Sequence, residues 1–218
     1  MLFLNSSLIQ RSSFRLLLLR RKLGADKDKW LNLKVINSWL KSITLAAALS
    51  LPAAAFAAPN VQVGFSPEGS ARALVLQVIA LAHKSVRMIG YSFQAPDIAQ
   101  ALVEAHKRGV EVRVVVDKKR NQNKASLKAM SFVAANGVQL RIDGHYHIQH
   151  DKTIIVDEQT VETGSFNYAP SAETENSENV VVLRDMPDIA SQYVAHWQSR
   201  WERGVPFTGE TSVKPGAG

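Results

Sequence analysis

The chain has 218 residues and carries 26 lysines and arginines against 19 acidic residues, which gives a formal net charge of +7. This length suits one α/β domain with a substantial core, or at most two small ones. The chain contains no cysteine, which excludes disulfides, cysteine-ligated zinc and thiol catalysis.

The excess positive charge lies in the first 57 residues, here called the leader, which hold nine basic and two acidic side chains. The remaining residues hold 17 of each sign. Net charge therefore gives no support for nucleic-acid binding by the rest of the chain, and only a local basic surface would supply it.

The leader has the pattern of a secretory signal peptide. Residues 34–41 form a short basic region, residues 43–51 form an apolar run, and 55–57 follow the small-x-small rule of cleavage sites. We expect cleavage near Ala57-Ala58, a periplasmic or secreted mature protein, and no stable membrane association after cleavage. A retained membrane anchor is the alternative, although the apolar run is short for a span. Residues 1–33 indicate either an over-extended start site or a separate targeting segment.

From Val61 onward, strand and helix patterns alternate, as is typical of a layered α/β domain. We expect a mixed, central β-sheet flanked by helices on both faces, within a domain of residues 58–205, and a flexible tail at 206–218. The expected strands are 61–65, 85–91, 110–117, 138–142, 149–156, 160–163 and 178–184. The expected helices are 66–84, 96–108, 124–135 and 187–203, the first opened by Ser66-Pro67-Glu68.

A basic run, Lys118, Lys119 and Arg120, directly follows the expected strand 110–117. Functional sites in α/β folds lie at the carboxyl ends of strands, so the run is a candidate surface for binding a phosphate backbone. An ordinary solvated face is the alternative interpretation.

The stretch from His150 to Asp157 reads H-x-K-x4-D and is followed by G-S-x-N. Side chains alternate faces along a strand, so His150 and Lys152 share one face while Asp157 is out of phase and reads as a structural, supporting residue. Ser165 and Asn167 also share a parity. An imidazole, an ammonium, a hydroxyl and an amide together suit a phosphate, because one group attacks and the others hold its oxygens.

These residues, with Gly90-Tyr91-Ser92-Phe93, the segment 108–113 and the run 176–179, resemble the phospholipase D superfamily over about Val61 to Trp201. The chain is similar to the branch of small bacterial endonucleases with a single such motif. The resemblance implies a phospholipase D-like α/β/α sandwich and a phosphodiester hydrolase without metal or other cofactor. It also implies an endonuclease of little sequence preference that cleaves DNA, with RNA as a further substrate.

Large members of the superfamily carry two motifs, so the resemblance implies an isologous homodimer that shares one site near its two-fold axis. One His150 then attacks phosphorus to give a phosphohistidine, and the second, protonated His150 serves the leaving group. Lys152 and Asn167 hold the non-bridging oxygens, and Ser165 orients or contacts phosphate. Glu178 accepts a hydrogen bond from the other ring nitrogen of His150.

Two other functions remain open at this stage. A phospholipase D acting on phospholipid head groups would need an apolar entry surface, which the sequence after the leader does not obviously show. A non-enzymatic nucleic-acid-binding module would have a vestigial site. The complete set of motif residues argues against this function. The histidines of segment 145–151 resemble a metal-binding cluster, but no matching second cluster follows, so we expect no metal.

Overall fold

The computed structural model describes residues 60–209. The signal peptide, its cleavage site and most of the expected tail lie outside the described residues, so these expectations stay predictions. Within residues 60–209, no helix combines the length and apolar character that crossing a membrane requires.

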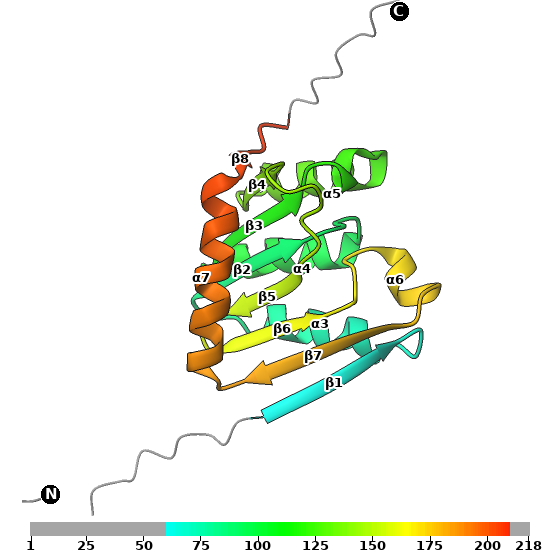
Figure 1. The fold of residues 1–218 in the computed structure, drawn as a ribbon, viewed down its shortest axis with the longest axis vertical. Coiled ribbons are helices and arrows are strands. Elements are labelled where there is room, and N and C mark those ends of the chain that lie inside the picture. The colour runs from blue at the N-terminus through cyan, green and yellow to red at the C-terminus, as the bar shows by residue number, and fades with distance from the viewer. Residues whose placement is uncertain (1–59, 210–218) are drawn as a thin grey trace, which may run out of the picture. The chain divides into compact units, whose positions relative to one another are not determined.

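An eight-stranded mixed sheet forms the centre of the described domain, in the order β1-β7-β6-β5-β2-β3-β4-β8 (Figure 1). β2, β3 and β4 run parallel to one another, and the remaining neighbours pair antiparallel. The bounds are β1 Asn60–Ser66, β2 Ser85–Gly90, β3 Glu111–Asp117, β4 Gln139–Asp143, β5 Lys152–Val156, β6 Thr160–Gly164, β7 Glu178–Arg184 and β8 Val205–Pro206. The expected mixed sheet is confirmed.

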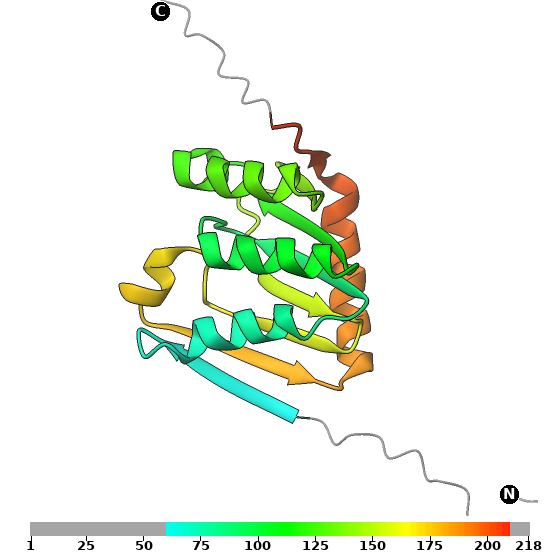
Figure 2. The same cartoon turned by 180° about the vertical axis from the view of Figure 1, so that it is seen from behind.

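Helices cover both faces of this sheet, which makes the α/β/α sandwich that the resemblance implied. Three lie on one face, α3 (Ser70–Ala80), α4 (Pro96–Lys107) and α5 (Lys124–Ala135), and α7 (Pro187–Arg203) lies on the other (Figures 1 and 2). The short helix α6 (Pro170–Thr174) and the 3-10 helix η1 (Arg120–Gln122) lie in connections between strands.

The sheet separates two apolar cores. The larger core joins α3, α4 and α5 to the sheet, and the smaller one packs Trp197 and Trp201 of α7 against residues such as Ile89 and Ile155. Neighbouring residues of β5 contribute to opposite cores, Ile154 to the larger and Ile155 to the smaller. β5 is therefore buried on both faces, as its run of aliphatic residues predicted, and burying each aliphatic side chain contributes about 1.5–3 kcal/mol.

The first helix was predicted to begin too early. Ser66 is the last residue of β1, and its hydroxyl donates to the carbonyl of Ala172 (2.6 Å). The helix begins at Ser70, after Gly69 in the left-handed region (φ 88°), and ends at Ala80. The strand 149–156 was also predicted too long, because β5 begins at Lys152. His150 therefore precedes the strand and is not part of it.

Candidate active site

The predicted site residues gather at one edge of the sheet because of strand direction and register. Lys152 at the start of β5 pairs with Gly90 at the end of β2, and Gly164 at the end of β6 pairs with Val180 near the start of β7. The carboxyl ends of β2, β3 and β6 thus meet the amino ends of β5 and β7 at this edge, here called the site edge. The segments carrying His150, Lys152, Ser165, Asn167 and Glu178 all emerge there, together with Lys118, Lys119 and Arg120.

His150 and Lys152 are in direct contact. Nζ of Lys152 lies 3.1 Å from Nδ1 and 3.2 Å from Nε2 of His150, and it donates to the backbone carbonyl of His150 (2.7 Å). His150 is exposed, whereas Lys152 is only 6% exposed. Burial lowers the pKa of Lys152, and the charges of Glu178 and Asp151 act in the opposite direction. A buried ammonium beside an exposed imidazole is a pair that an incoming anion would stabilise.

Tyr91, the residue after β2, lies against this pair. Its ring centroid is 4.4 Å from that of His150, with the two planes inclined by 58°. Nζ of Lys152 lies 5.2 Å from the same centroid, and the guanidinium of Arg120 lies 5.9 Å from it. Arg120 of the basic run after β3 and His150 thus lie near the same aromatic ring, a contact that sequence reasoning did not assign.

Ser165 and Asn167 occupy the bend after β6. The hydroxyl of Ser165 accepts the backbone N–H of Asn179 (3.0 Å), which ties the bend to β7. Gly164, at this bend, is so close to β7 that an added Cβ would lie 2.2 Å from the carbonyl oxygen of Asn179. Oδ1 of Asn167 is buried and meets no hydrogen-bond donor within residues 60–209. This oxygen is an acceptor and would not bind a phosphate oxygen, so the expected contact of the Asn167 N–H groups with phosphate stays a prediction.

Glu178 is half-buried at the start of β7, where its Oε1 accepts from Nδ2 of Asn176 (2.8 Å). Within this single chain its described hydrogen bond thus comes from Asn176 and not from a ring nitrogen of His150. Its charge does act on Lys152, whose pKa it raises. The proposed pairing of Glu178 with His150 stays a prediction for a site built from two chains.

Asp157 lies at the opposite edge of the sheet from His150. Its carboxylate accepts the backbone N–H groups of His83, Lys84 and Ser85, at 3.0, 2.7 and 2.8 Å. Burial would raise its pKa, but these hydrogen bonds outweigh that effect and hold it below the usual value. The motif aspartate therefore anchors the start of β2 and takes no part in the site edge.

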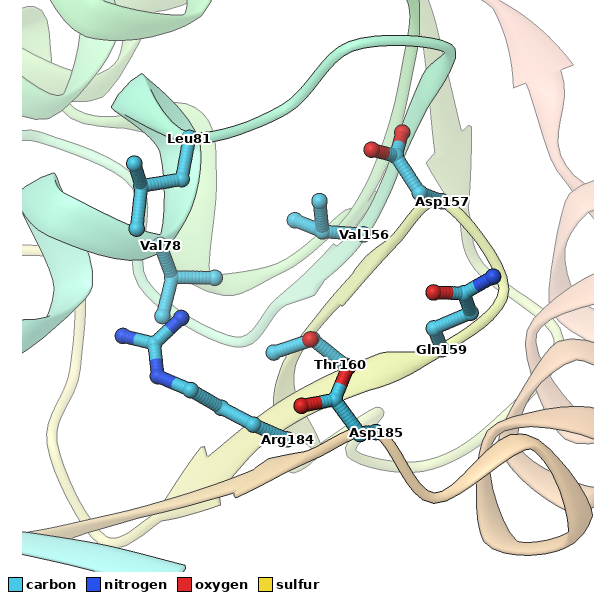
Figure 3. Close-up of a pocket in the computed structure, with 8 residues that line it drawn as sticks. All are labelled: Val78, Leu81, Val156, Asp157, Gln159, Thr160, Arg184 and Asp185. Carbon is cyan, nitrogen blue, oxygen red and sulfur yellow. The ribbon is translucent and has the colours of Figure 1, made fainter. Parts of the chain in front are cut away.

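A shallow hollow of about 240 Å³ lies beside Asp157, between the end of α3 and the turns after β5 and β7 (Figure 3). Arg184, one of its lining residues, donates hydrogen bonds to the side-chain oxygens of Gln62 (2.8 Å) and Gln77 (3.0 Å). The hollow is remote from His150 and holds none of the predicted catalytic residues.

Two buried polar residues that sequence reasoning missed fix the loops around the site. The carboxylate of Asp117 accepts the N–H groups of Arg120 (2.7 Å) and Gln149 (2.9 Å), and so joins the basic run to the segment before His150. The side-chain amide of Asn121 accepts from the N–H of Phe93 and donates to the carbonyl of Tyr91, both at 2.8 Å. The signal for these residues was their polarity at the end of a buried strand.

The histidines of segment 145–151 do not form a metal centre in the described chain. Residues 60–209 contain no group of three or more His, Asp or Glu side chains placed to hold a metal ion. The ring of His145 packs edge-on against Tyr146 (4.9 Å between centroids), and His147 is exposed. Asp151 instead contacts Nε2 of His196 on α7, at 3.1 Å.

The site edge thus brings together the segments that carry an exposed imidazole, a largely buried ammonium and a side-chain amide. A neutral imidazole can attack phosphorus, while an ammonium and amide N–H groups stabilise the non-bridging oxygens as charge builds. An α/β/α sandwich with this set at the ends of β2, β5 and β6 defines a phosphodiester-cleaving enzyme of the phospholipase D type.

Comparison with known families identifies the chain in the same way. A family model described as "Cardiolipin synthase, PLD-like domain" matches residues 75–201. The chain therefore belongs to the phospholipase D superfamily, within the single-domain branch that includes the protein Nuc, and is a phosphodiester hydrolase.

Individual relatives support this placement. The crystal structure of Nuc from Salmonella typhimurium, a phospholipase D family member, is 56% identical, covers 68% of this chain and 98% of its own, and superposes with a TM-score of 0.68. Phospholipase D of Rickettsia prowazekii is 33% identical over 166 residues, which are 76% of this chain and 80% of that protein. The human mitochondrial cardiolipin hydrolase is 26% identical over 187 residues, with 82% and 73% covered.

Proposed function

We propose that this protein is a metal-independent endonuclease with little sequence preference, which hydrolyses DNA, and RNA as a further substrate, through a phosphohistidine at a site shared by two copies of the chain. The observation that carries the choice of nucleic acid is that Arg120, the last residue of the exposed basic run Lys118, Lys119 and Arg120, lies near the ring of Tyr91, which packs against His150. The signal-peptide pattern of the leader supports action in the periplasm or outside the cell.

The basic run is well placed to hold a polyanion. Lys118, Lys119 and Arg120 are all exposed, and they follow β3 at the site edge. Exposed Lys124 and Lys128 continue the positive charge along α5. A nucleic-acid backbone would meet these cations next to the nucleophile, which answers the objection that the chain after the leader has no net charge.

Two copies of the site edge would supply the chemistry. A ring nitrogen of one His150 attacks phosphorus, the bond from phosphorus to the leaving oxygen breaks, and the second, protonated His150 gives that oxygen its proton. Water then attacks the phosphohistidine, its proton passes to the second histidine, and the bond between nitrogen and phosphorus breaks. The Lys152 and Asn167 side chains stabilise the charge on the non-bridging oxygens in both steps.

An apolar strip on β1 supports the pairing of two copies. Val61, Val63 and Phe65 are 55%, 58% and 51% exposed and point to the face of the sheet on which α7 packs. None of the described helices crosses β1 on that face (Figure 1). Because Phe65 pairs with Asn179, next to Glu178, the strip ends beside the site edge. A second copy seated on this strip would bring its own site edge close, as a two-fold contact requires.

Phospholipase D activity on lipid head groups is the second candidate. It is favoured by the names of curated relatives, which include phospholipase D proteins and mitochondrial cardiolipin hydrolases. The strip on β1 would then serve as a lipid-facing surface. The basic run beside His150 favours the endonuclease, since a long polyanion would contact cations on either side of the scissile bond.

One assay tests the substrate. The purified chain without its leader is given plasmid DNA, RNA, phosphatidylcholine vesicles and cardiolipin vesicles in excess chelator, with His150→Gln as the matched control. We expect cleavage of DNA and RNA that survives chelation and is absent in the control. Faster release of lipid head groups than of nucleotides would overturn the endonuclease proposal, and loss of activity in chelator would overturn metal independence.

A mixing experiment tests the shared site. Wild-type and His150→Gln chains are unfolded together, refolded at varied ratios and assayed. If each site needs both histidines, activity falls with the square of the wild-type fraction. A linear fall would mean that each chain works alone, and the shared-site proposal would then be wrong.

A further inference from the structure

We propose that Tyr91 is a positioning residue for the reaction, whose ring holds the imidazole of His150 and the ammonium of Lys152 in the geometry that attack on phosphorus requires. This inference rests on the proposed role of His150 as nucleophile, and it holds whether the natural substrate is a nucleic acid or a lipid.

The backbone of Tyr91 is fixed from two sides. Its N–H donates to the carbonyl of Asp151 (3.0 Å), which lies between His150 and Lys152 in the chain. Its own carbonyl accepts from Nδ2 of Asn121 (2.8 Å), a residue that is only 2% exposed. Tyr91 is therefore tied to the catalytic segment on one side and to the 3-10 helix after β3 on the other.

His150 needs such a support because of where it lies. It precedes β5, it is exposed, and the sheet does not pack its ring into either core. The described ring contact of His150 is with Tyr91, at 4.4 Å between centroids and a tilt of 58°. Tilted aromatic pairs at this separation attract each other, so the tyrosine ring limits the rotamers open to the histidine.

The same ring lies near two cations. Nζ of Lys152 and the guanidinium of Arg120 lie 5.2 and 5.9 Å from its centroid. The face of an aromatic ring attracts a positive charge, and here it lies near the ammonium of the largely buried Lys152 side chain. Tyr91 thus contacts the nucleophile, the cation that stabilises the phosphate and the arginine of the basic run, and an error in its position would disturb all three.

Two substitutions separate a positioning ring from a merely space-filling one. Tyr91→Phe keeps the aromatic ring, and Tyr91→Leu keeps an apolar side chain without it. With a chromogenic aryl phosphodiester as substrate, we expect Tyr91→Phe to retain kcat within about threefold. We expect Tyr91→Leu to lower kcat by about 10- to 100-fold with little change in KM, since a misplaced nucleophile slows the chemical step more than binding.

A spectroscopic measurement accompanies the kinetics. The ring-proton resonances of His150, assigned by their absence in His150→Gln, should keep their ring-current shift in Tyr91→Phe and lose it in Tyr91→Leu. Thermal unfolding of each variant checks that the fold is intact.

Wild-type kcat in Tyr91→Leu, or equal losses in both variants, would overturn the role of the ring. Because the aryl substrate is neither nucleic acid nor lipid, this result is independent of the substrate panel. Failure of the endonuclease proposal would therefore leave the Tyr91 inference standing, and the reverse also holds.

Discussion

Nζ of Lys152 lies almost equally far from the two ring nitrogens of His150, at 3.1 and 3.2 Å, while it donates to the backbone carbonyl of the same histidine at 2.7 Å. The buried ammonium therefore lies within hydrogen-bonding reach of His150, the proposed nucleophile. A phosphate bound at the site edge would replace the ring as a partner of the ammonium. That exchange would free the imidazole for attack and place the positive charge on the non-bridging oxygens.

Substitution of His150 and substitution of Lys152 should each remove catalysis, for different reasons. His150→Gln lacks the proposed nucleophile, and Lys152→Met lacks the charge that we propose stabilises the transition state. We expect each to lower kcat by at least about 10³-fold and the double variant to be little worse, because residues that act as a unit are not additive. Single-turnover kinetics and recovery of acid-labile phosphoprotein measure the effect. Formation of that adduct by His150→Gln would show that another residue attacks.

The pKa of Lys152 provides a test of Glu178. Burial lowers this pKa, and the charge of Glu178 raises it. Glu178→Gln removes the raising effect, so the ammonium should lose its proton at a lower pH. We expect the alkaline limb of kcat/KM to move to lower pH, while Glu175→Gln, an exposed residue of the preceding loop, leaves it in place. An unmoved limb in Glu178→Gln would mean that Lys152 protonation does not control the rate.

The sequence predicted the elements whose signals are local. Helices α5 and α7 and strand β7 match the predicted bounds, because proline, asparagine and glycine mark their ends and aliphatic residues repeat between them. The start of α3 was missed because Ser66 is held in β1 by a bond to Ala172, a residue more than a hundred positions away. No pattern near Ser66 could have indicated that contact.

The site residues, like the helices and strands, were predicted where the signal was local and missed where it depended on distant contacts. The motif spacing predicted His150, Lys152, Ser165 and Asn167, the family resemblance added Glu178, and the structure brings their segments to one edge. The roles of Tyr91, Asp117 and Asn121 depend on contacts between separate loops, so spacing along the chain carried no sign of them. The argument that His150 and Lys152 share a face assumed that both residues lie in one strand. That assumption was wrong, because β5 begins at Lys152, two residues after His150.

Charge reversal tests the basic run. Lys118→Glu with Lys119→Glu should weaken DNA binding and flatten its dependence on salt, because each phosphate contact contributes about 0.9 to the slope of log K against log salt. The matched control is Lys84→Glu with Lys107→Glu, two exposed lysines at the opposite edge of the sheet. Binding isotherms of His150→Gln backgrounds between low and physiological salt give the slopes. If the two double variants had equal slopes of log K against log salt, Lys118 and Lys119 would have no specific part in DNA binding.

A charge in the strip on β1 tests the proposed dimer contact. Val63→Lys places an ammonium where we expect the second copy to pack, so the variant should sediment as a monomer and lose at least about tenfold in activity per chain. Val205→Lys is the control, because Val205 is similarly exposed (61%) but lies on β8 at the other end of the sheet. Sedimentation velocity across a range of concentrations separates the two. A dimeric, active Val63→Lys would place the contact elsewhere.

Glu162 gives the described domain a pH-dependent stability. It is fully buried in β6, where its Oε2 accepts the hydroxyl of Tyr168 (2.9 Å), and its Oε1 has no hydrogen-bond partner within residues 60–209. Burial raises the pKa of Glu162 to about 8, above the ordinary value of 4.5. Between these values the folded chain keeps the proton and the unfolded chain does not. The contribution of protonated Glu162 to the free energy of unfolding is thus complete below pH 4.5 and is lost as the pH rises toward 8.

Glu162→Gln keeps the shape and the acceptor for Tyr168 but cannot ionise. Relative to wild type, the free energy of unfolding of this variant should therefore rise with pH, by up to about 1.4 kcal/mol per pH unit across this window. Urea unfolding of both proteins at about pH 5, 6.5 and 8 measures the difference in unfolding free energy. Glu104→Gln, which changes an exposed glutamate of α4, serves as the control. A difference between Glu162→Gln and wild type that stays constant with pH would mean that Glu162 is ionised in the folded protein.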